Sequence, residues 1–578
     1  MTPTNKHPDF FFNVGFGLIS LLAILDLITA VSFSFHIPIS RFHFPIAAAI
    51  LLLSGWIYIR QEYPLKKVKV YLKTMIFVFA IVLVSILIAD NFYDLSFDGQ
   101  TYHQEGVYQL VHFQWNPFYK VLPDKVNLSL FVNHYPKQAE TSAAAVYSMT
   151  GRIETGKSLN LILLVTSFCM IFSYLKSFTQ LSDSLALILS VFFALNPIVI
   201  HQALTYMVDG QLGSVLLCML VCCLLLYDQS NLPRLFLLAF LIVICINIKF
   251  TAAVYTAIFI GLTLILFFIT KRFQQFKDFF FVACLSTLFA VLLVGFNPYL
   301  TNFVQNGNVF YPILGKHSID IIALNSPPGF SQMNRFERFG ISTFAHTDNI
   351  DSRQGGRMPI LKIPFSLNRQ EIKSLSDPDI RIAGFGPLFS GIISLTICLL
   401  IFSIWYKSGV LFNDPLAWFI LILILSIAVC PEAWWARFIP QFWFVPLIVI
   451  ILVSSINNRL VIALRNLTCF AIGLNITFSL YMVLQTNILK TAEINYQMAQ
   501  FRALDAPLNV NFMGFDANRI RFAESGVRFV KQNAFHGLVI PVVYSKAVVL
   551  VDSPLPVLPV PWLIMLEERI KGEVKSQR

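Results

Sequence analysis

Residues 71–90 read YLKTMIFVFAIVLVSILIAD, an apolar run that ends on an aspartate. A helix needs about 20 successive apolar residues to cross the hydrocarbon core of a bilayer. Runs of similar length recur along the whole chain of 578 residues. The sequence therefore predicts an all-α polytopic membrane protein, because a helix satisfies all of its backbone hydrogen bonds within lipid.

The composition points to the same class of protein. Hydrophobic residues make up 56% of the chain and charged residues only 13%, whereas a soluble domain carries about 25% charged residues. The mean hydropathy is +0.69. The net charge is +11, but the basic residues lie mostly in short loops that set orientation or face lipid headgroups. No basic run with interleaved aromatics stands alone, so nucleic acid is not an expected partner.

The nine cysteines all fall in or at the ends of apolar runs, and the larger loops contain none. We therefore expect no disulfide-stapled loops and no zinc site. The run at about 10–33 is long enough to span and has no small-residue cleavage site after it, so we interpret it as the first span and not as a signal peptide.

The apolar runs predict about thirteen transmembrane helices. Their approximate bounds are 10–33, 43–59, 71–90, 159–175, 184–200, 211–227, 233–248, 251–270, 278–297, 386–405, 415–430, 441–456 and 461–488.

Lysine and arginine predict the orientation of these spans. With the N-terminus in the cytoplasm, the inner loops collect basic residues such as Lys66, Lys271 and Arg272, as the positive-inside rule requires. An odd number of spans then places the C-terminal tail outside. The loops expected on that outer face are 91–158, 201–210, 298–385 and 431–440. Nearly all of the polar loop residues are thus expected on one face. This arrangement favours an enzyme that acts at the membrane surface over a simple transporter or channel.

The chain divides near residue 490. Residues 1–489 form the predicted membrane domain, and residues 490–578 form a small α/β domain on the outer face. Period-two stretches at 508–512 and 538–543 predict strands, and prolines between Pro554 and Pro561 interrupt regular structure.

The first long loop begins DNFYDLSFDGQTYH at residues 90–103. Asp94, Asp98 and His103 therefore lie close to the headgroup plane, with Tyr102 beside the histidine. A carboxylate here could act as general base on an acceptor hydroxyl. Alternatively, Asp98 caps a helix that starts at the following glycine.

Two ionisable residues lie at membrane boundaries. Asp209 either belongs to a functional site or caps the N-terminus of the next span. Lys249 sits between two apolar runs, where it needs a partner such as a lipid phosphate, or it snorkels to the surface.

Arginines in the outer loops are candidates for phosphate recognition, because a guanidinium binds phosphate through two parallel hydrogen bonds. Arg335 lies in the second long loop. Arg437 and Glu432 flank paired tryptophans in the segment PEAWWARFIP, residues 431–440. Tryptophans are also common at any membrane interface. The aromatic segments 115–119 and 134–137 could form part of the same interfacial belt. Those two segments could instead stack on a sugar.

Three segments resemble bacterial membrane proteins of the GT-C glycosyltransferase superfamily, which includes protein O-mannosyltransferases and lipid A aminoarabinose transferases. The segments are DGQTYH (98–103) with WNP (115–117), NPY (297–299) with NVFYP (308–312), and WWARFIP (434–440). The resemblance covers residues of about 10 to 490.

The resemblance implies a GT-C-like bundle in the bacterial inner membrane, with its active site at the outer leaflet and a polyprenyl-phosphate sugar as donor. Such enzymes use an acidic residue of the first outer loop as catalytic base. Asp98 matches this position, and Asp94 is the second choice. Here the loop follows the third predicted span, whereas in the family it commonly follows the first and often carries an Asp-Glu pair.

We therefore expect an inverting transfer of a sugar to a glycan, lipid or protein acceptor. Asp98 accepts the acceptor proton, and Arg437, with Lys249 or Arg335, neutralises the phosphate leaving group. Asp209 and His103 orient the acceptor or a divalent cation, the only cofactor that these residues suggest. The alternatives are a surface polysaccharide polymerase or ligase, and a transporter of lipid-linked glycans.

Overall fold

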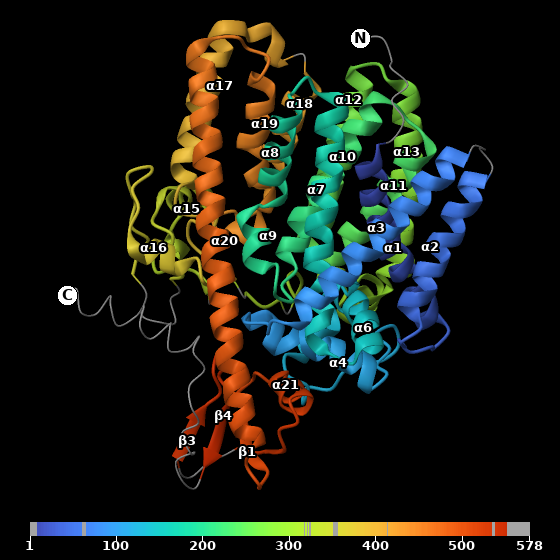
Figure 1. The fold of residues 1–578 in the computed structure, drawn as a ribbon, viewed down its shortest axis with the longest axis vertical. Helices are drawn as coiled ribbons and strands as arrows, with labels where there is room; N and C mark the ends of the chain where they lie inside the picture. The colour runs from blue at the N-terminus through green and yellow to red at the C-terminus, as the bar shows by residue number, and fades with distance from the viewer. Residues whose placement is uncertain are drawn as a thin grey trace.

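The computed structural model describes residues 9–60, 65–316, 318–320, 322, 325–350, 357–412, 414–533 and 538–551 (Figure 1). The structure is 69% helical. Nine helices in the described part of the chain are long and apolar enough to cross a membrane, and four more are apolar but shorter. The expectation of a mostly helical protein with many long apolar helices is confirmed, while the count of thirteen spans stays a prediction.

The long apolar helices follow the predicted runs closely. They are α1 (Phe10–Ser34), α2 (His43–Arg60), α3 (Leu65–Asp90), α7 (Ser158–Phe178), α10 (Asp209–Asp228), α12 (Phe250–Ile269), α13 (Phe273–Phe289), α17 (Phe389–Phe412) and α20 (Arg459–Arg502). The shorter ones are α8 (Asp183–Ala194), α11 (Leu232–Ile248), α18 (Pro415–Val429) and α19 (Phe444–Val453).

The run expected to span at 184–200 is broken in the structure. Helix α8 ends at Ala194, and a separate helix α9 begins at Pro197 and ends at Gln202. Proline cannot donate the backbone hydrogen bond that would continue the first helix. The Asn196 side chain instead caps α9 by accepting a hydrogen bond of 3.1 Å from the Ile198 amide.

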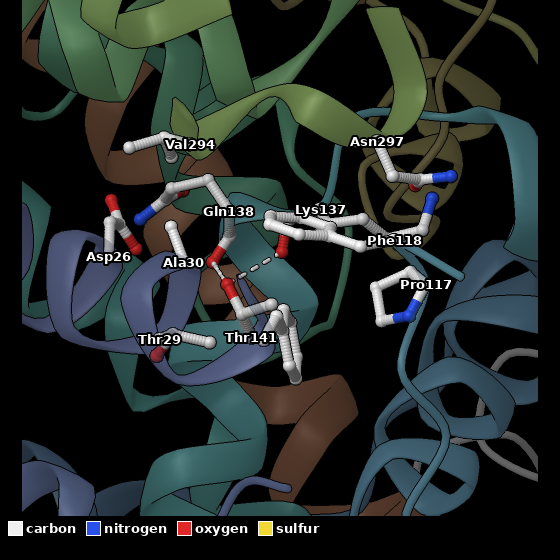
Figure 2. Close-up of a pocket in the computed structure, with 11 residues that line it drawn as sticks. Asp26, Thr29, Ala30, Pro117, Phe118, Lys137, Gln138, Thr141, Val294 and Asn297 are labelled. Atoms are coloured by element: carbon white, nitrogen blue, oxygen red, sulfur yellow. Dashed lines mark hydrogen bonds between the residues drawn. The ribbon is translucent and has the colours of Figure 1, made fainter. Parts of the chain in front are cut away.

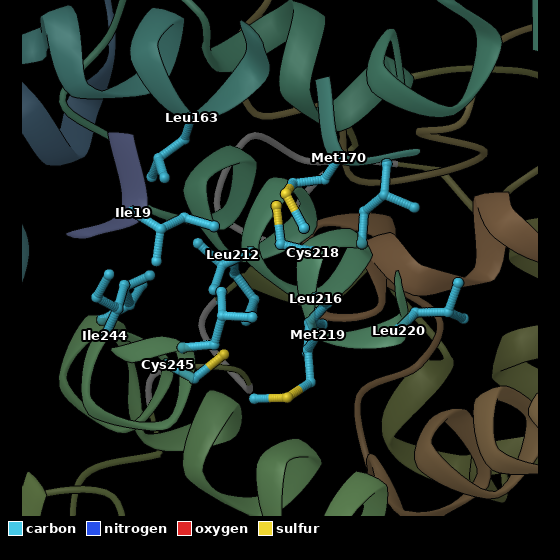
Figure 3. Packing of buried hydrophobic residues seen from close by; sticks show 14 of the residues in the cluster. Ile19, Leu163, Met170, Leu212, Leu216, Cys218, Met219, Leu220, Ile244 and Cys245 are labelled. Carbon is cyan, nitrogen blue, oxygen red and sulfur yellow. The ribbon is translucent and has the colours of Figure 1, made fainter. Parts of the chain in front are cut away.

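Helix α10 lies at the centre of the bundle and packs against α7 and α11, while α1 packs on both α7 and α11 (Figure 3). Side chains such as Ile19, Met170 and Cys218 fill this core and are essentially inaccessible. Gly15 lets α1 approach α7 closely, since a Cβ there would lie 2.8 Å from the Met170 sulfur. All nine cysteines are free thiols in the structure.

Shorter helices fill the connecting segments. They are α4 (Gln104–His112), α5 (Ser129–His134), α6 (Gln138–Thr150), α14 (Thr301–Asn306), α15 (Arg335–Phe344) and α16 (Arg369–Ser374). Helices α4 and α6 lie near the C-terminal sheet, at the bottom of Figure 1. We call this end of the bundle the sheet end.

The C-terminal unit is a small sheet with one helix. Its elements are β1 (Leu508–Asn511), α21 (Asn518–Glu524), β2 (Phe529–Lys531), β3 (Leu538–Pro541) and β4 (Val548–Val551). The strand order is β2-β1-β4-β3, with β1 and β2 parallel and the other pairs antiparallel. The predicted strands at 508–512 and 538–543 are confirmed, and Pro554–Pro561 lie outside the described residues.

The expected boundary near residue 490 does not coincide with the end of a helix. Helix α20 continues without a break to Arg502 and carries the sheet on its last turns. Ile494, Met498 and Phe501 recur at helical spacing and are buried against the sheet unit. This one-sided burial accounts for the extension of the helix beyond the predicted span at 461–488.

Candidate active site at the sheet end

Arg437 is the centre of a charged cluster drawn from four separate parts of the chain. It lies in a single 3₁₀ turn, Ala436–Phe438, between α18 and α19. Its guanidinium nitrogens lie 3.1 Å from Asp98, 3.3 Å from Asp209 and 3.2 Å from Asp379. Burial alone would lower the pKa of Arg437, but the three carboxylates raise it well above its usual value. The guanidinium is therefore permanently charged.

Lys249 adds a second cation to this cluster. It interrupts the helical backbone between α11 and α12, and its ammonium forms an ion pair with Asp209. The ammonium also lies 4.2 Å from the ring centre of Phe438. The partner that the sequence requires for this lysine is thus a carboxylate of the protein itself.

Asp379 is the carboxylate of the cluster that sequence reasoning missed. It accepts a hydrogen bond of 3.1 Å from the indole nitrogen of Trp435. Burial raises its pKa to about 6, although Arg437 opposes this shift. No local pattern in the loop 298–385 distinguishes this aspartate from its neighbours.

Asp98 reaches Arg437 because of the turn that precedes it. The Asp94 carboxylate accepts hydrogen bonds from the Ser96 amide (2.8 Å) and hydroxyl (2.7 Å). The Ser96 hydroxyl in turn accepts a hydrogen bond from the Gly99 amide. Gly99 is required here, since a Cβ would lie 1.6 Å from an oxygen of Asp94. A short π-helix, Gly99–His103, then leads into α4.

The capping alternatives for Asp98 and Asp209 are not observed. The Asp98 side chain makes no capping hydrogen bond to the π-helix. Asp209 is the first residue of α10, and Val208 occupies the cap position without a side-chain bond. Both carboxylates face the Arg437 cluster instead.

Asp94 lies outside the cluster. It is fully buried, and its second oxygen accepts a hydrogen bond of 3.1 Å from the Tyr206 amide. Burial, with a smaller contribution from Glu154, raises its pKa to about 6. These contacts shape the loop and leave Asp94 little access to a substrate.

Two phenols border the Asp98–Arg437 pair. Burial raises the pKa of Tyr102 and Tyr135, and the nearby Asp98 carboxylate raises both further. Both hydroxyls therefore stay protonated and can donate hydrogen bonds. Tyr135, which the sequence presents only as part of an aromatic segment, belongs to the site as much as Tyr102 does.

The other candidate residues lie apart from Arg437. His103 is buried, with its Nδ1 atom 2.7 Å from a Glu140 oxygen. Glu432 pairs with Arg338 at 3.1 Å. Arg335 is exposed at the start of α15, with its guanidinium 4.8 Å from the Phe336 ring centre. Of the two cations expected to assist Arg437, the structure brings Lys249 into the cluster.

A small cavity with both polar and apolar lining residues lies between α1, α6 and the segment around Asn297 (Figure 2). Its volume is about 10 Å³, enough for one water molecule. Ser142 donates a hydrogen bond of 3.0 Å to Asp26, and the Gln138 amide points toward the same carboxylate (Figure 2). Burial lowers the pKa of the adjacent Lys137 to about 8. The cavity shares no lining residue with the Arg437 cluster.

The C-terminal unit holds the loop that carries Asp98. Arg519 of α21 forms an ion pair with the buried Glu105 of α4. The Asn518 side chain donates a hydrogen bond of 3.1 Å to Gln100, two residues after Asp98. Arg521 donates a hydrogen bond of 3.1 Å to the Asp94 carbonyl oxygen. The unit therefore braces the first long loop from the side opposite the bundle core.

Within the residues that the structure describes, no group of three histidine, cysteine, aspartate or glutamate side chains is arranged to hold a metal ion. Comparison of the chain with models of known protein families, with curated proteins and with solved structures finds no match.

Proposed function

We propose that this chain is a membrane glycosyltransferase of the GT-C kind. It moves a sugar from a polyprenyl-phosphate donor to a hydroxyl of a glycan, lipid or protein acceptor. The reaction takes place at the outer face of the bacterial inner membrane, with the N-terminus in the cytoplasm and the sheet unit outside. The observation that carries the proposal is the convergence of Asp98, Arg437, Lys249 and Asp209 at the sheet end of an apolar helical bundle.

The cluster supplies the two functions that an inverting transfer requires. The acceptor oxygen bonds to the anomeric carbon while the bond from that carbon to the phosphate oxygen breaks. Asp98 takes the acceptor proton, and the leaving phosphate keeps the bonding electron pair. Arg437 and Lys249 stabilise the phosphate charge that grows in the transition state.

Asp379 suits the resting state of such a site. Without a donor, Arg437 is held by three carboxylates. A phosphate must compete with them for the guanidinium. Asp379 can yield its place to a phosphate, because its pKa of about 6 makes protonation accessible near neutral pH. Tyr102 and Tyr135 are then available to donate hydrogen bonds to the sugar.

Mass spectrometry of lipids that co-purify with the protein in mild detergent tests the proposal. The samples are wild type, Arg437→Ala and the control Arg357→Ala, whose side chain is 67% exposed and pairs with Asp348 at 3.7 Å. We expect polyprenyl phosphate or its monoglycosyl form on wild type and the control, and its loss from Arg437→Ala. Long lipid-linked glycans would favour a polymerase or ligase. Bulk phospholipid alone on all three proteins would contradict the donor assignment.

A further inference from the structure

The segment 358–367, in the second long loop, exposes six large apolar side chains. We call it the apolar segment. Its large exposed apolar side chains are Met358 (40%), Ile360 (52%), Leu361 (60%), Ile363 (80%), Phe365 (40%) and Leu367 (41%). Contiguous exposed apolar side chains of this kind mark a contact surface.

The one lysine inside the apolar segment points the opposite way. The Lys362 side chain is 1% exposed, pairs with the buried Glu371 and donates hydrogen bonds to the carbonyl oxygens of Ser366 and Pro387. A loop in water normally exposes its lysine and buries its isoleucines. Here the lysine is internal and the isoleucines face outward, which suits an apolar surrounding.

The apolar segment is held in place by the backbone and is not a loose loop. Leu361 forms a β-bridge with Ala345. The Lys362 amide donates to the Phe344 carbonyl and the His346 amide donates to the Ile360 carbonyl, both at 2.9 Å. The exposure of the isoleucines is therefore a fixed feature of the fold.

The position of the apolar segment identifies what covers it. The Phe365 ring lies against the first turn of α17, since a Cβ on Gly391 would lie 2.5 Å from that ring. Farther along α17, the side chains of Ile397 and Ile401 are 50% and 59% exposed on a helix of membrane-spanning length. The neighbouring helices α15 and α16 lie at the edge of the bundle beside α20 and below the upper part of α17 (Figure 1). The apolar segment thus extends the lipid-facing surface of α17 at its sheet end.

We propose that the apolar segment inserts into the bilayer leaflet at the sheet end, with lipid acyl chains around Ile360, Ile363 and Leu367. Insertion anchors the loop that presents Asp379 to Arg437. The connection runs through two contacts: Glu371 binds both Lys362 of the apolar segment and the Thr347 amide, and the next residue, Asp348, forms a β-bridge with Ile382, three residues after Asp379.

Photo-crosslinking tests this placement on the full chain in vesicles of phosphatidylcholine and phosphatidylglycerol. A diazirine amino acid replaces Ile363. The reference positions are Phe281, which is 68% exposed on the spanning helix α13, and Val539, which is 51% exposed on β3. We expect lipid adducts at 363 and 281, and water adducts at 539.

Water adducts at 363, as at 539, would overturn the proposal, and so would crosslinks from 363 to a second copy of the chain. If the variant at 363 does not assemble, Leu367 carries the probe in its place. Because the readout is lipid contact and not activity, it stands or falls independently of the proposed glycosyl transfer.

Discussion

At the scale of single residues, Arg437 is the charge on which its neighbours depend. Asp209 is buried and Asp379 half-buried beside it, and its removal would leave carboxylates in a poorly solvated site. Breaking a buried ion pair from one side costs about 3–5 kcal/mol. A fold defect could therefore imitate a binding defect in Arg437→Ala.

A compensating substitution separates these two effects. We expect Arg437→Ala to lower the midpoint of thermal unfolding, measured by size-exclusion chromatography after heating. Arg437→Ala/Asp379→Asn should recover part of that loss, because it removes one stranded charge. The double variant should still fail to retain polyprenyl phosphate. If the stabilised double variant still retained polyprenyl phosphate, Arg437 would not be part of the donor site.

Asp98 is tested by a change that keeps its shape. Asp98→Asn preserves a hydrogen-bond acceptor for Arg437 but cannot take up a proton. We expect sugar transfer to fall by at least about 100-fold, with unchanged abundance in the membrane and unchanged donor lipid. Asp348→Asn, a carboxylate of the second long loop that pairs with Arg357, serves as the control. Full transfer by Asp98→Asn would exclude Asp98 as the base.

At the scale of elements, α21 and α4 are joined by the ion pair between Arg519 and Glu105, whose two side chains differ in exposure. Glu105 is 2% exposed and Arg519 is 23% exposed. Lys531 and Asp516 form a second pair on the same C-terminal unit, but the lysine is 51% exposed. The first pair is the more buried, and Arg519 contacts both carboxylate oxygens of Glu105, whereas Lys531 contacts one oxygen of Asp516. The first pair should therefore contribute more to stability.

We expect Arg519→Ala to destabilise docking of the C-terminal unit by about 3 kcal/mol, because the Glu105 charge stays buried. Lys531→Ala should cost less than about 1 kcal/mol. Cleavage of the unit by a protease at increasing denaturant concentration measures both. Adding Glu105→Gln to Arg519→Ala should restore part of the resistance. Equal resistance of the two single variants would contradict the bracing role.

The elements differ in how far the sequence determines them. The long apolar helices are predictable because a spanning helix requires a continuous apolar run. Helix α20 extends past its predicted end only where its residues are buried against the sheet. The site was predictable one residue at a time. Asp98 and Arg437 stand out by their positions at loop boundaries, but they are 339 residues apart, and no periodicity links them. Asp379 was missed because only the folded loop brings it to Arg437.

At the scale of the whole molecule, the sheet unit and the bundle meet through groups that titrate near neutral pH. Glu524 of α21 accepts a hydrogen bond of 2.8 Å from the Ile153 amide. Burial raises its pKa to about 7, and the neighbouring Glu154 adds to the shift. Asp94, at the same contact through Arg521, has a pKa of about 6.

These shifts predict that docking of the sheet unit weakens as the pH rises. The folded pKa of Glu524 lies above the usual glutamate value of 4.5, so the docked state binds the proton more tightly than the undocked state does. Its contribution is complete below about pH 4.5 and is lost as the pH rises through about 7. Hydrogen exchange of the α21 amides, corrected for the intrinsic rate, should show protection falling between pH 5.5 and pH 8.

Glu524→Gln should flatten most of this profile and leave the smaller dependence that Asp94 contributes. Asp516→Asn, on the same unit but in the exposed pair with Lys531, should retain the wild-type profile. If Glu524→Gln followed the wild-type profile unchanged, Glu524 would not be the titrating group, and the pH dependence would have to arise elsewhere at the contact.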